Sequence, residues 1–133
     1  MHLLIIEDNP GDVRLIEEML LETGYGDGLR LVKAGTLSAG LDALTREKPD
    51  LVIMDLGLPD SQGPESVALV ADREPDAPIV VLTGLDSEAM GLRAIELGAQ
   101  DYVVKGQITP AILARTIRHA IERKSAQRTI LDS

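Results

Sequence analysis

Four short apolar runs in the chain each end directly in polar residues that can contact a phosphoryl group or a cation. Runs of this length, rich in Ile and Val and bounded by turn residues, are typical of strands buried on both faces of a parallel sheet. The runs are 3–6, followed by Glu7 and Asp8; 51–54, followed by Asp55; 79–82, followed by Thr83; and 102–104, followed by Lys105. Because parallel strands point the same way, we expect these polar residues to meet at one edge of the sheet, where doubly wound folds bind ligands.

Between these runs, apolar residues recur at helical spacing, with capping residues before them and Gly or Pro after them. The pattern predicts helices that begin at Asn9 or Asp12, at Thr36 or Ser38, before Val67, at Ser87 and at Thr109–Pro110. A more exposed strand is predicted over 29–32. In the helix after Ser87, the residues Leu92, Ile95 and Leu97 are expected to point inward. Strands and helices that alternate in this way predict one three-layer α/β domain with right-handed crossovers.

The composition is typical of a single folded domain. The chain has 133 residues, of which 44% are hydrophobic and 2% aromatic, so the core is expected to be aliphatic. Cysteine is absent, which excludes disulfides, thiolate metal sites and a thiol nucleophile. The first apolar run is too short for a signal peptide and no segment approaches the length of a membrane span. We therefore expect a cytoplasmic protein that does not associate with membranes.

The charge is distributed unevenly along the chain. The formal net charge of −9 argues against nucleic acid as a direct partner. Residues 109–133 nevertheless hold five basic and two acidic side chains, a local charge of +3, and residues 122–128 are polar on every side. We therefore divide the chain into a domain of residues 1–121 and a helical extension or linker of residues 122–133. The extension is expected either to fray or to pair in a homodimer, and the chain is either a single-domain protein or a piece of a longer one.

Three carboxylates at the expected sheet edge, those of Glu7, Asp8 and Asp55, suit a hard divalent cation. Mg²⁺ prefers one or two carboxylates together with water and phosphate oxygens in an octahedral shell. The hydroxyl of Thr83 and the amine of Lys105 are expected beside them. Capping of the following helix is the simpler interpretation of any one acid, but it does not explain all five residues together. The set predicts that Mg²⁺ and a phosphoryl group share one site.

Other phosphate-binding and catalytic patterns are poorly supported. No G-x-x-x-x-G-K-[ST] loop is present, which excludes a nucleotide-hydrolysing P-loop. Gly24, Gly26 and Gly28 lie between a helix and a strand, whereas a dinucleotide-binding glycine loop follows a strand and opens a helix. His2 precedes the first strand and His119 lies within the last helix, so neither is placed to activate a nucleophile.

Four motifs, in this order and at these spacings, make the chain resemble a receiver domain of bacterial two-component response regulators from residue 1 to about residue 121. They are residues 5–9 (IIEDN), 52–60 (VIMDLGLPD), 80–84 (VVLTG) and 98–105 (GAQDYVVK). The resemblance implies a flavodoxin-like, doubly wound sheet of five parallel strands in the order 2-1-3-4-5, with helices on both faces.

The resemblance also assigns roles at the phosphoacceptor. Asp55 would accept the phosphoryl group from a phosphohistidine on a sensor histidine kinase or phosphotransfer protein. Glu7, Asp8 and Asp55 would hold Mg²⁺, and the backbone carbonyl of Gly57 would complete the protein ligands. Positioning and charge neutralisation supply most of the catalysis in phosphoryl transfer.

Three further residues would respond to the phosphoryl group. Lys105 would pair with the phosphoryl oxygens, because its ammonium is a mobile point charge. Thr83 would donate its hydroxyl to a phosphoryl oxygen after transfer, and Tyr102 would then change rotamer. The face built from the fourth helix, fifth strand and fifth helix would change its partners as a result.

The chain departs from the family pattern beside the acceptor. Gly106 follows Lys105 where the family usually has Pro after a cis peptide bond. A cis bond that does not precede proline costs about 2.5–4 kcal/mol, so the peptide is expected to be either trans or strained. Gly57 and Gly84 carry no side chains, so we expect one approach to the phosphoryl group to be open to water.

We interpret the chain as a phosphorylated switch and not as an enzyme. The first alternative is a receiver-like protein-binding module that is not phosphorylated, which the complete set of five polar residues disfavours. The second is a Mg²⁺-dependent phosphohydrolase of the haloacid dehalogenase type. Such enzymes place a D-x-D motif after the first strand, whereas this chain has Glu7-Asp8-Asn9-Pro10 there.

Overall fold

The structure is a computed structural model that describes the backbone of residues 1–132 and the side chains of residues 1–127. Ser133, the last residue of the expected extension, lies outside the described residues. No helix in the described part of the chain is long and apolar enough to cross a membrane.

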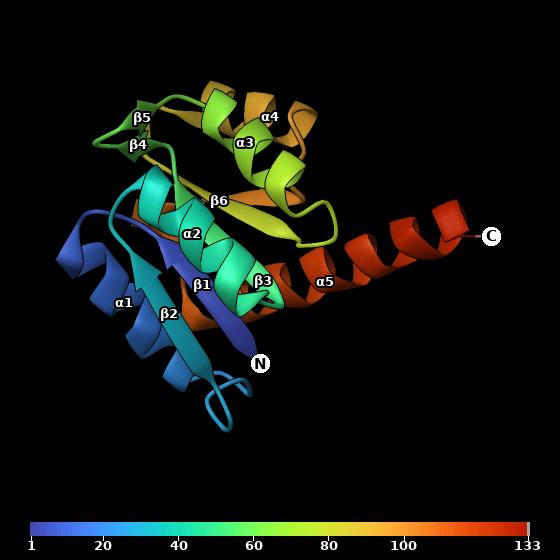
Figure 1. Cartoon of the computed structure of the whole chain (residues 1–133). Helices are drawn as coiled ribbons and strands as arrows, with labels where there is room; N and C mark the ends of the chain where they lie inside the picture. The colour runs from blue at the N-terminus through green and yellow to red at the C-terminus, as the bar shows by residue number, and fades with distance from the viewer. Residues whose placement is uncertain (133) are drawn as a thin grey trace.

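Five parallel strands form one sheet in the order β2-β1-β3-β6-β7, which confirms the predicted order (Figure 1). The strands are β1 (His2–Ile6), β2 (Arg30–Ala34), β3 (Leu51–Asp55), β6 (Ile79–Thr83) and β7 (Asp101–Val104). A two-stranded antiparallel hairpin, β4 (Gly57–Leu58) and β5 (Ser61–Gln62), follows β3. Each crossover between neighbouring strands contains a helix, so the carboxyl ends of all five strands lie at the same edge of the sheet.

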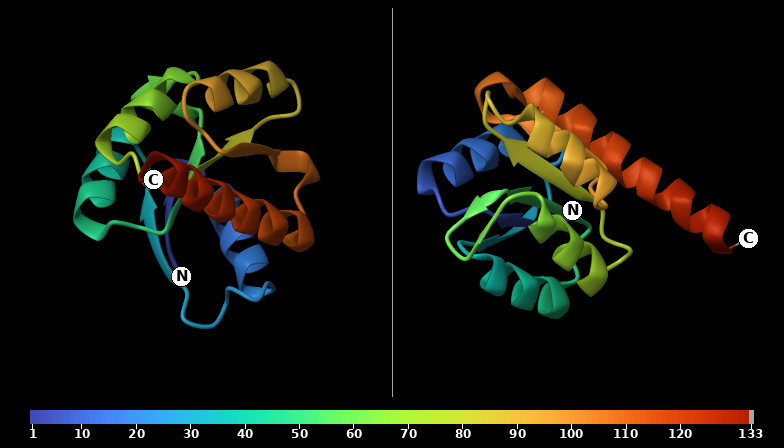
Figure 2. Two further views of the ribbon diagram at one scale, coloured as in Figure 1. Left: turned by 90° about the vertical axis from the view of Figure 1, so that its right-hand side faces the viewer. Right: turned by 90° about the horizontal axis from the view of Figure 1, so that it is seen from above.

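Helices cover both faces of the sheet (Figure 2). They are α1 (Pro10–Leu21), α2 (Leu37–Glu47), α3 (Glu65–Arg73), α4 (Glu88–Glu96) and α5 (Pro110–Asp132), with a 3₁₀ turn at Lys105–Gln107. The buried residues form two clusters, one with α1 and α5 and the other with α2, α3 and α4. The molecule is therefore the predicted three-layer α/β domain.

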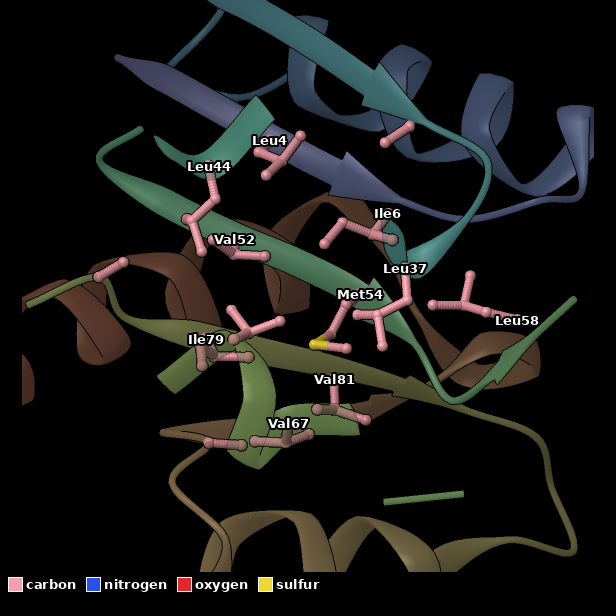
Figure 3. Packing of buried hydrophobic residues seen from close by; sticks show 14 of the residues in the cluster. Leu4, Ile6, Leu37, Leu44, Val52, Met54, Leu58, Val67, Ile79 and Val81 are labelled. Carbon is pink, nitrogen blue, oxygen red and sulfur yellow. The ribbon is translucent and has the colours of Figure 1, made fainter. Parts of the chain in front are cut away.

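Alternate residues of each strand belong to opposite layers of the core. In β1, Leu3 and Ile5 pack with α1 and α5, whereas Leu4 and Ile6 pack with α2 and α3. The second cluster is shown in Figure 3, where the labelled side chains from β1, β3 and β6 meet those of the helices. Its largest members are fully buried, and aliphatic side chains fill it as the composition predicted.

Local hydrogen bonds decide between the alternative helix starts. The Asn9 side chain accepts the N–H groups of Gly11 at 2.9 Å and Asp12 at 3.1 Å, so Asn9 caps α1. Thr36 caps α2 by accepting the N–H of Ala39 at 3.0 Å, which excludes Ser38 as the N-cap. Asp12 is consequently left available for another role.

The prediction that α4 packs through Leu92 and Ile95 was wrong. Leu92 is 58% exposed and Ile95 is 40% exposed. Leu97, which follows the last residue of α4, does pack against the core as predicted, although it is only partly buried. The buried residues of α4 are instead Gly91 and Ala94. Helix and sheet approach closely at these small residues, so hydrophobic periodicity selected the wrong face of the helix.

The last helix passes the expected boundary at residue 121 without a break and projects from the sheet (Figure 1). Two contacts hold its outer part to the loop between α4 and β7. Arg123 donates to the backbone carbonyl of Gln100 at 2.9 Å, and the Gln100 amide donates to the Gln127 side chain at 3.3 Å. The side chains of residues 128–132 lie outside the description.

Candidate functional site

The five predicted site residues lie at the carboxyl edge of the sheet. Glu7 and Asp8 follow β1, Asp55 and Thr83 end β3 and β6, and Lys105 follows β7. One oxygen from each of Glu7, Asp8 and Asp55 lies within 4.8 Å of the others. Neighbouring strands of the sheet, β1, β3, β6 and β7, thus bring together residues that are far apart in the sequence.

Lys105 lies among three carboxylates. Its Nζ is 2.9 Å from Glu7 Oε2, 2.9 Å from Asp12 Oδ2 and 3.1 Å from Asp55 Oδ1. Burial alone would lower the pKa of Lys105, but the hydrogen bonds and charges of these three carboxylates outweigh it and raise that pKa. The ammonium is therefore charged at neutral pH and partly offsets the repulsion among the acids.

Glu7 is the most buried acid of the group. Burial raises the pKa of Glu7, although the Lys105 ammonium and the N–H of Asn9, which donates to Oε1 at 3.1 Å, act in the opposite direction. Oε2 is buried and faces the Lys105 ammonium, which forms an ion pair with it at 2.9 Å. The oxygens of Glu7, Asp8 and Asp55 lie close enough together to form a donor set that fits Mg²⁺.

The carboxylate of Asp55 is partly buried, and each of its two oxygens has a partner that orients it. Its Oδ2 accepts the N–H of Gly57 at 3.0 Å, and its Oδ1 faces Lys105. A cavity of about 280 Å³ opens beside it, lined by Gly57, Thr83 and Gly84 among others. The absence of side chains at the two glycines thus leaves space next to the carboxylate.

Thr83 and Tyr102 make their contacts with residues other than Asp55. The Thr83 hydroxyl is buried and donates to the carbonyl of Val103 at 3.4 Å. Tyr102 is partly buried and packs against the cluster that includes α4. A Cβ on Gly91 would lie 2.7 Å from a carbon of the Tyr102 ring, so the ring lies directly on the bare backbone of α4.

Sequence reasoning missed two residues that shape the site. Asp12 was considered only as a helix cap, yet it is an ion-pair partner of Lys105. Gly91 carried a signal that could have been used, because glycine inside a helix is unfavourable and needs a packing reason. The peptide between Lys105 and Gly106 is trans, since the described chain has no cis bonds.

Comparisons with known proteins agree with this geometry. A family model described as "Response regulator receiver domain" matches residues 3–118. The KDP operon transcriptional regulatory protein KdpE of Escherichia coli is 36% identical over 125 residues, which are 94% of this chain and 53% of KdpE. The photosynthetic apparatus regulatory protein RegA of Rhodobacter capsulatus is 36% identical over 117 residues, 85% of this chain and 61% of RegA.

Solved structures show the same fold. A response regulator receiver domain protein from Clostridium thermocellum has a TM-score of 0.80 and 26% identity, with 95% of this chain and 98% of that chain covered. By contrast, this chain spans about half the length of KdpE.

Replacement of Lys105 by Met is expected to lower the free energy of unfolding by roughly 1–3 kcal/mol near neutral pH, between the values for exposed and buried ion pairs. The variant leaves Glu7, Asp12 and Asp55 without their ammonium. Burial raises the pKa of Glu7 on folding and the Lys105 ammonium opposes this rise, so the pKa of Glu7 should be higher still in the variant. The folded variant then binds more protons than its unfolded state as the pH falls, which restores part of its stability. The loss should therefore shrink as urea unfolding is repeated from about pH 7 down to about pH 5.

The matched control is Lys33→Met, which removes an ammonium that pairs with Glu17 at 3.2 Å on the surface. This change should alter stability by no more than about 0.5 kcal/mol. Equal losses for the two variants, or a loss at Lys105 that does not depend on pH, would contradict the assigned role of the ammonium.

Proposed function

Because the chain belongs to the response regulator receiver domain family, whose function is phosphorelay signalling, we propose that it is a switch that accepts a phosphoryl group on Asp55. The donor is a phosphohistidine on a sensor histidine kinase or a phosphotransfer protein. The observation that carries the proposal is the position of Asp55, which lies beside both the Lys105 ammonium and the acids that follow β1.

We propose that Glu7, Asp8 and Asp55 hold Mg²⁺, with the backbone carbonyl of Gly57 as a further ligand. The support is the close approach of the three carboxylate oxygens, one of each residue lying within 4.8 Å of the others. When bound, Mg²⁺ supplies positive charge to the phosphoryl oxygens.

The residues of the chain account for the remaining steps of the transfer. A carboxylate oxygen of Asp55 forms a bond to phosphorus as the bond from phosphorus to the imidazole nitrogen breaks. The electron pair of the broken bond leaves with the imidazole. The N–H of Gly57 holds the other carboxylate oxygen in place, and the Lys105 ammonium stabilises charge on the phosphoryl oxygens. The product is an acyl phosphate on Asp55.

Phosphorylation then changes the surface of α4, β7 and α5. The added charge and acceptors draw the Thr83 hydroxyl from the Val103 carbonyl towards the phosphoryl group. Tyr102 changes rotamer as Thr83 moves, and its ring leaves the backbone of Gly91. Leu92 and Ile95, which are exposed on α4, are part of the surface that this movement alters.

We propose residues 1–121 as the receiver domain and residues 122–133 as a helical extension or linker. The family model ends at residue 118, which supports a boundary near residue 121, and the course of α5 to Asp132 supports a helical extension. Connection of the extension to an output region is proposed because this chain spans about half the length of relatives named as transcriptional regulators. Pairing of the extension in a homodimer is proposed because a short polar helix is marginal alone in water. The net charge of −9 supports a receiver that does not itself bind nucleic acid.

Incubation with acetyl phosphate and Mg²⁺ is expected to add one phosphoryl group to the protein, detected by intact-protein mass spectrometry. Asp55→Asn should abolish the gain because the nucleophilic oxygen is lost, and Asp8→Asn should slow it because a metal ligand is lost. Asp72→Asn is the matched control, an exposed carboxylate on α3 whose loss should have no effect. A gain that survives Asp55→Asn, or that does not need Mg²⁺, would contradict the assignment, and no gain at all would favour the unphosphorylated binding module.

Phosphorylation is also expected to shift the amide NMR signals of Thr83, Tyr102 and residues 86–98. In Thr83→Val the shifts near Asp55 should persist while those of Tyr102 and α4 largely disappear, because the hydroxyl that couples them is gone. Thr116→Val is the control, since it removes another buried hydroxyl, one that bonds within α5. Shifts that stay within the Asp55 loop in the unmodified chain would show that this coupling does not exist.

A further inference from the structure

The hairpin that follows Asp55 is connected to a distant helix through Asp60. The carboxylate of Asp60 lies in the turn between β4 and β5 and accepts two backbone N–H groups of the first turn of α2. Its Oδ1 accepts from Leu37 at 2.8 Å and its Oδ2 accepts from Ser38 at 2.9 Å. Helix α2 therefore receives caps from two places, because Thr36 satisfies only the N–H of Ala39.

This interaction is strong for a surface contact. The hydrogen bonds from Ser38 and Leu37 lower the pKa of Asp60, so the carboxylate is ionised at neutral pH. Its negative charge lies at the positive end of the α2 dipole, where both bonds are charge-assisted. Most helix caps come from the adjoining residue, whereas this one comes from a segment 23 residues further along the chain. The contact consequently links two separate parts of the fold.

The hairpin needs such an anchor. It contains only two residue pairs, Gly57 with Gln62 and Leu58 with Ser61, and a hairpin of this size is marginal alone in water. Leu58 is fully buried and holds one side of the hairpin in the core. Asp60 holds the turn on the other side, at the start of α2. These two contacts together fix the path of the chain.

Gly57, the first residue of the hairpin, is part of the acceptor site. Its N–H donates to Asp55 Oδ2 at 3.0 Å, and Gly63 at the far end of the hairpin donates back to the carbonyl of Leu56 at 2.8 Å. Glycine has no side chain to restrict its backbone, so the neighbouring contacts must set the direction of its peptide groups. Loss of the anchor at Asp60 would therefore allow Gly57 to move relative to Asp55.

We propose that Asp60 is a positioning residue of the acceptor site, which holds Gly57 against Asp55 by anchoring the β4–β5 hairpin to α2. Loss of Asp60 should weaken Mg²⁺ binding, and this consequence rests on the proposed function because it assumes that the Gly57 carbonyl and Asp55 bind Mg²⁺. Loss of Asp60 should also free the Gly57 peptide in the protein without metal, and this consequence does not rest on the proposed function. The alternative is that Asp60 merely stabilises α2.

The test compares Asp60→Ala with Thr36→Ala. Each variant removes one side-chain cap from the same end of α2, but only the first releases the hairpin. In the metal-free protein, amide hydrogen exchange at Gly57 should become faster in Asp60→Ala and stay unchanged in Thr36→Ala. Mg²⁺ titration followed by NMR should give a dissociation constant raised about tenfold in Asp60→Ala, the lower end of the losses that follow when groups supporting metal ligands are removed. Asp60→Asn should be intermediate, since its amide oxygen can keep one of the two hydrogen bonds.

The two measurements separate the proposals. Unchanged Gly57 exchange in Asp60→Ala, or equal effects of Asp60→Ala and Thr36→Ala on exchange, would overturn the positioning role. Faster Gly57 exchange in Asp60→Ala supports the anchor even if the unmodified chain binds no Mg²⁺, a result that would contradict the proposed metal site alone. Urea unfolding of both variants is the control, which checks that the two proteins have similar free energies of unfolding.

Discussion

The ammonium of Lys105, within about 3 Å of three carboxylates, is the interaction on which the carboxyl edge of the sheet depends. Parallel strands bring Glu7 and Asp55 together, and the first turn of α1 adds Asp12. Like charges at these separations repel strongly when they are partly removed from water. One ammonium offsets part of that repulsion, and the remaining negative charge is what makes the site suited to a cation.

The same arrangement explains how phosphorylation of Asp55 can change the surface formed by α4, β7 and α5. The ammonium is already in contact with Asp55, so a phosphoryl group added there would redistribute its partners among Glu7, Asp12 and the new oxygens. The neighbouring elements differ in how firmly they are held. The β4–β5 hairpin is fixed by Leu58 and Asp60, whereas the side-chain hydroxyl of Thr83 is held by a long hydrogen bond of 3.4 Å. Phosphorylation of Asp55 is therefore expected to move Thr83 and Tyr102 more than the β4–β5 hairpin.

The sequence predicted much of this structure because the strongest signals were local. Short apolar runs before Glu7, Asp55, Thr83 and Lys105 indicated buried parallel strands, and parallel strands require their ends to meet. Contacts that depend on three-dimensional approach were not predictable in this way. Asp60 contacts the first turn of α2 at Leu37, 23 residues earlier in the chain, and no spacing rule indicates this contact. The orientation of α4 also escaped prediction, because close packing of Gly91 and Ala94 outweighed the burial of Leu92.

The most direct test of this account is the Mg²⁺ affinity of the unmodified chain and of Lys105→Met, measured by calorimetry or NMR at low salt. If the ammonium neutralises the carboxylates that bind the metal, its removal should tighten Mg²⁺ binding by roughly fivefold or more, since one charge at about 4 Å is worth about 1 kcal/mol even in water. Lys124→Met, at the opposite edge of the sheet, should leave the affinity nearly unchanged because salt screens distant charges. Unchanged or weaker Mg²⁺ binding in Lys105→Met would contradict the account.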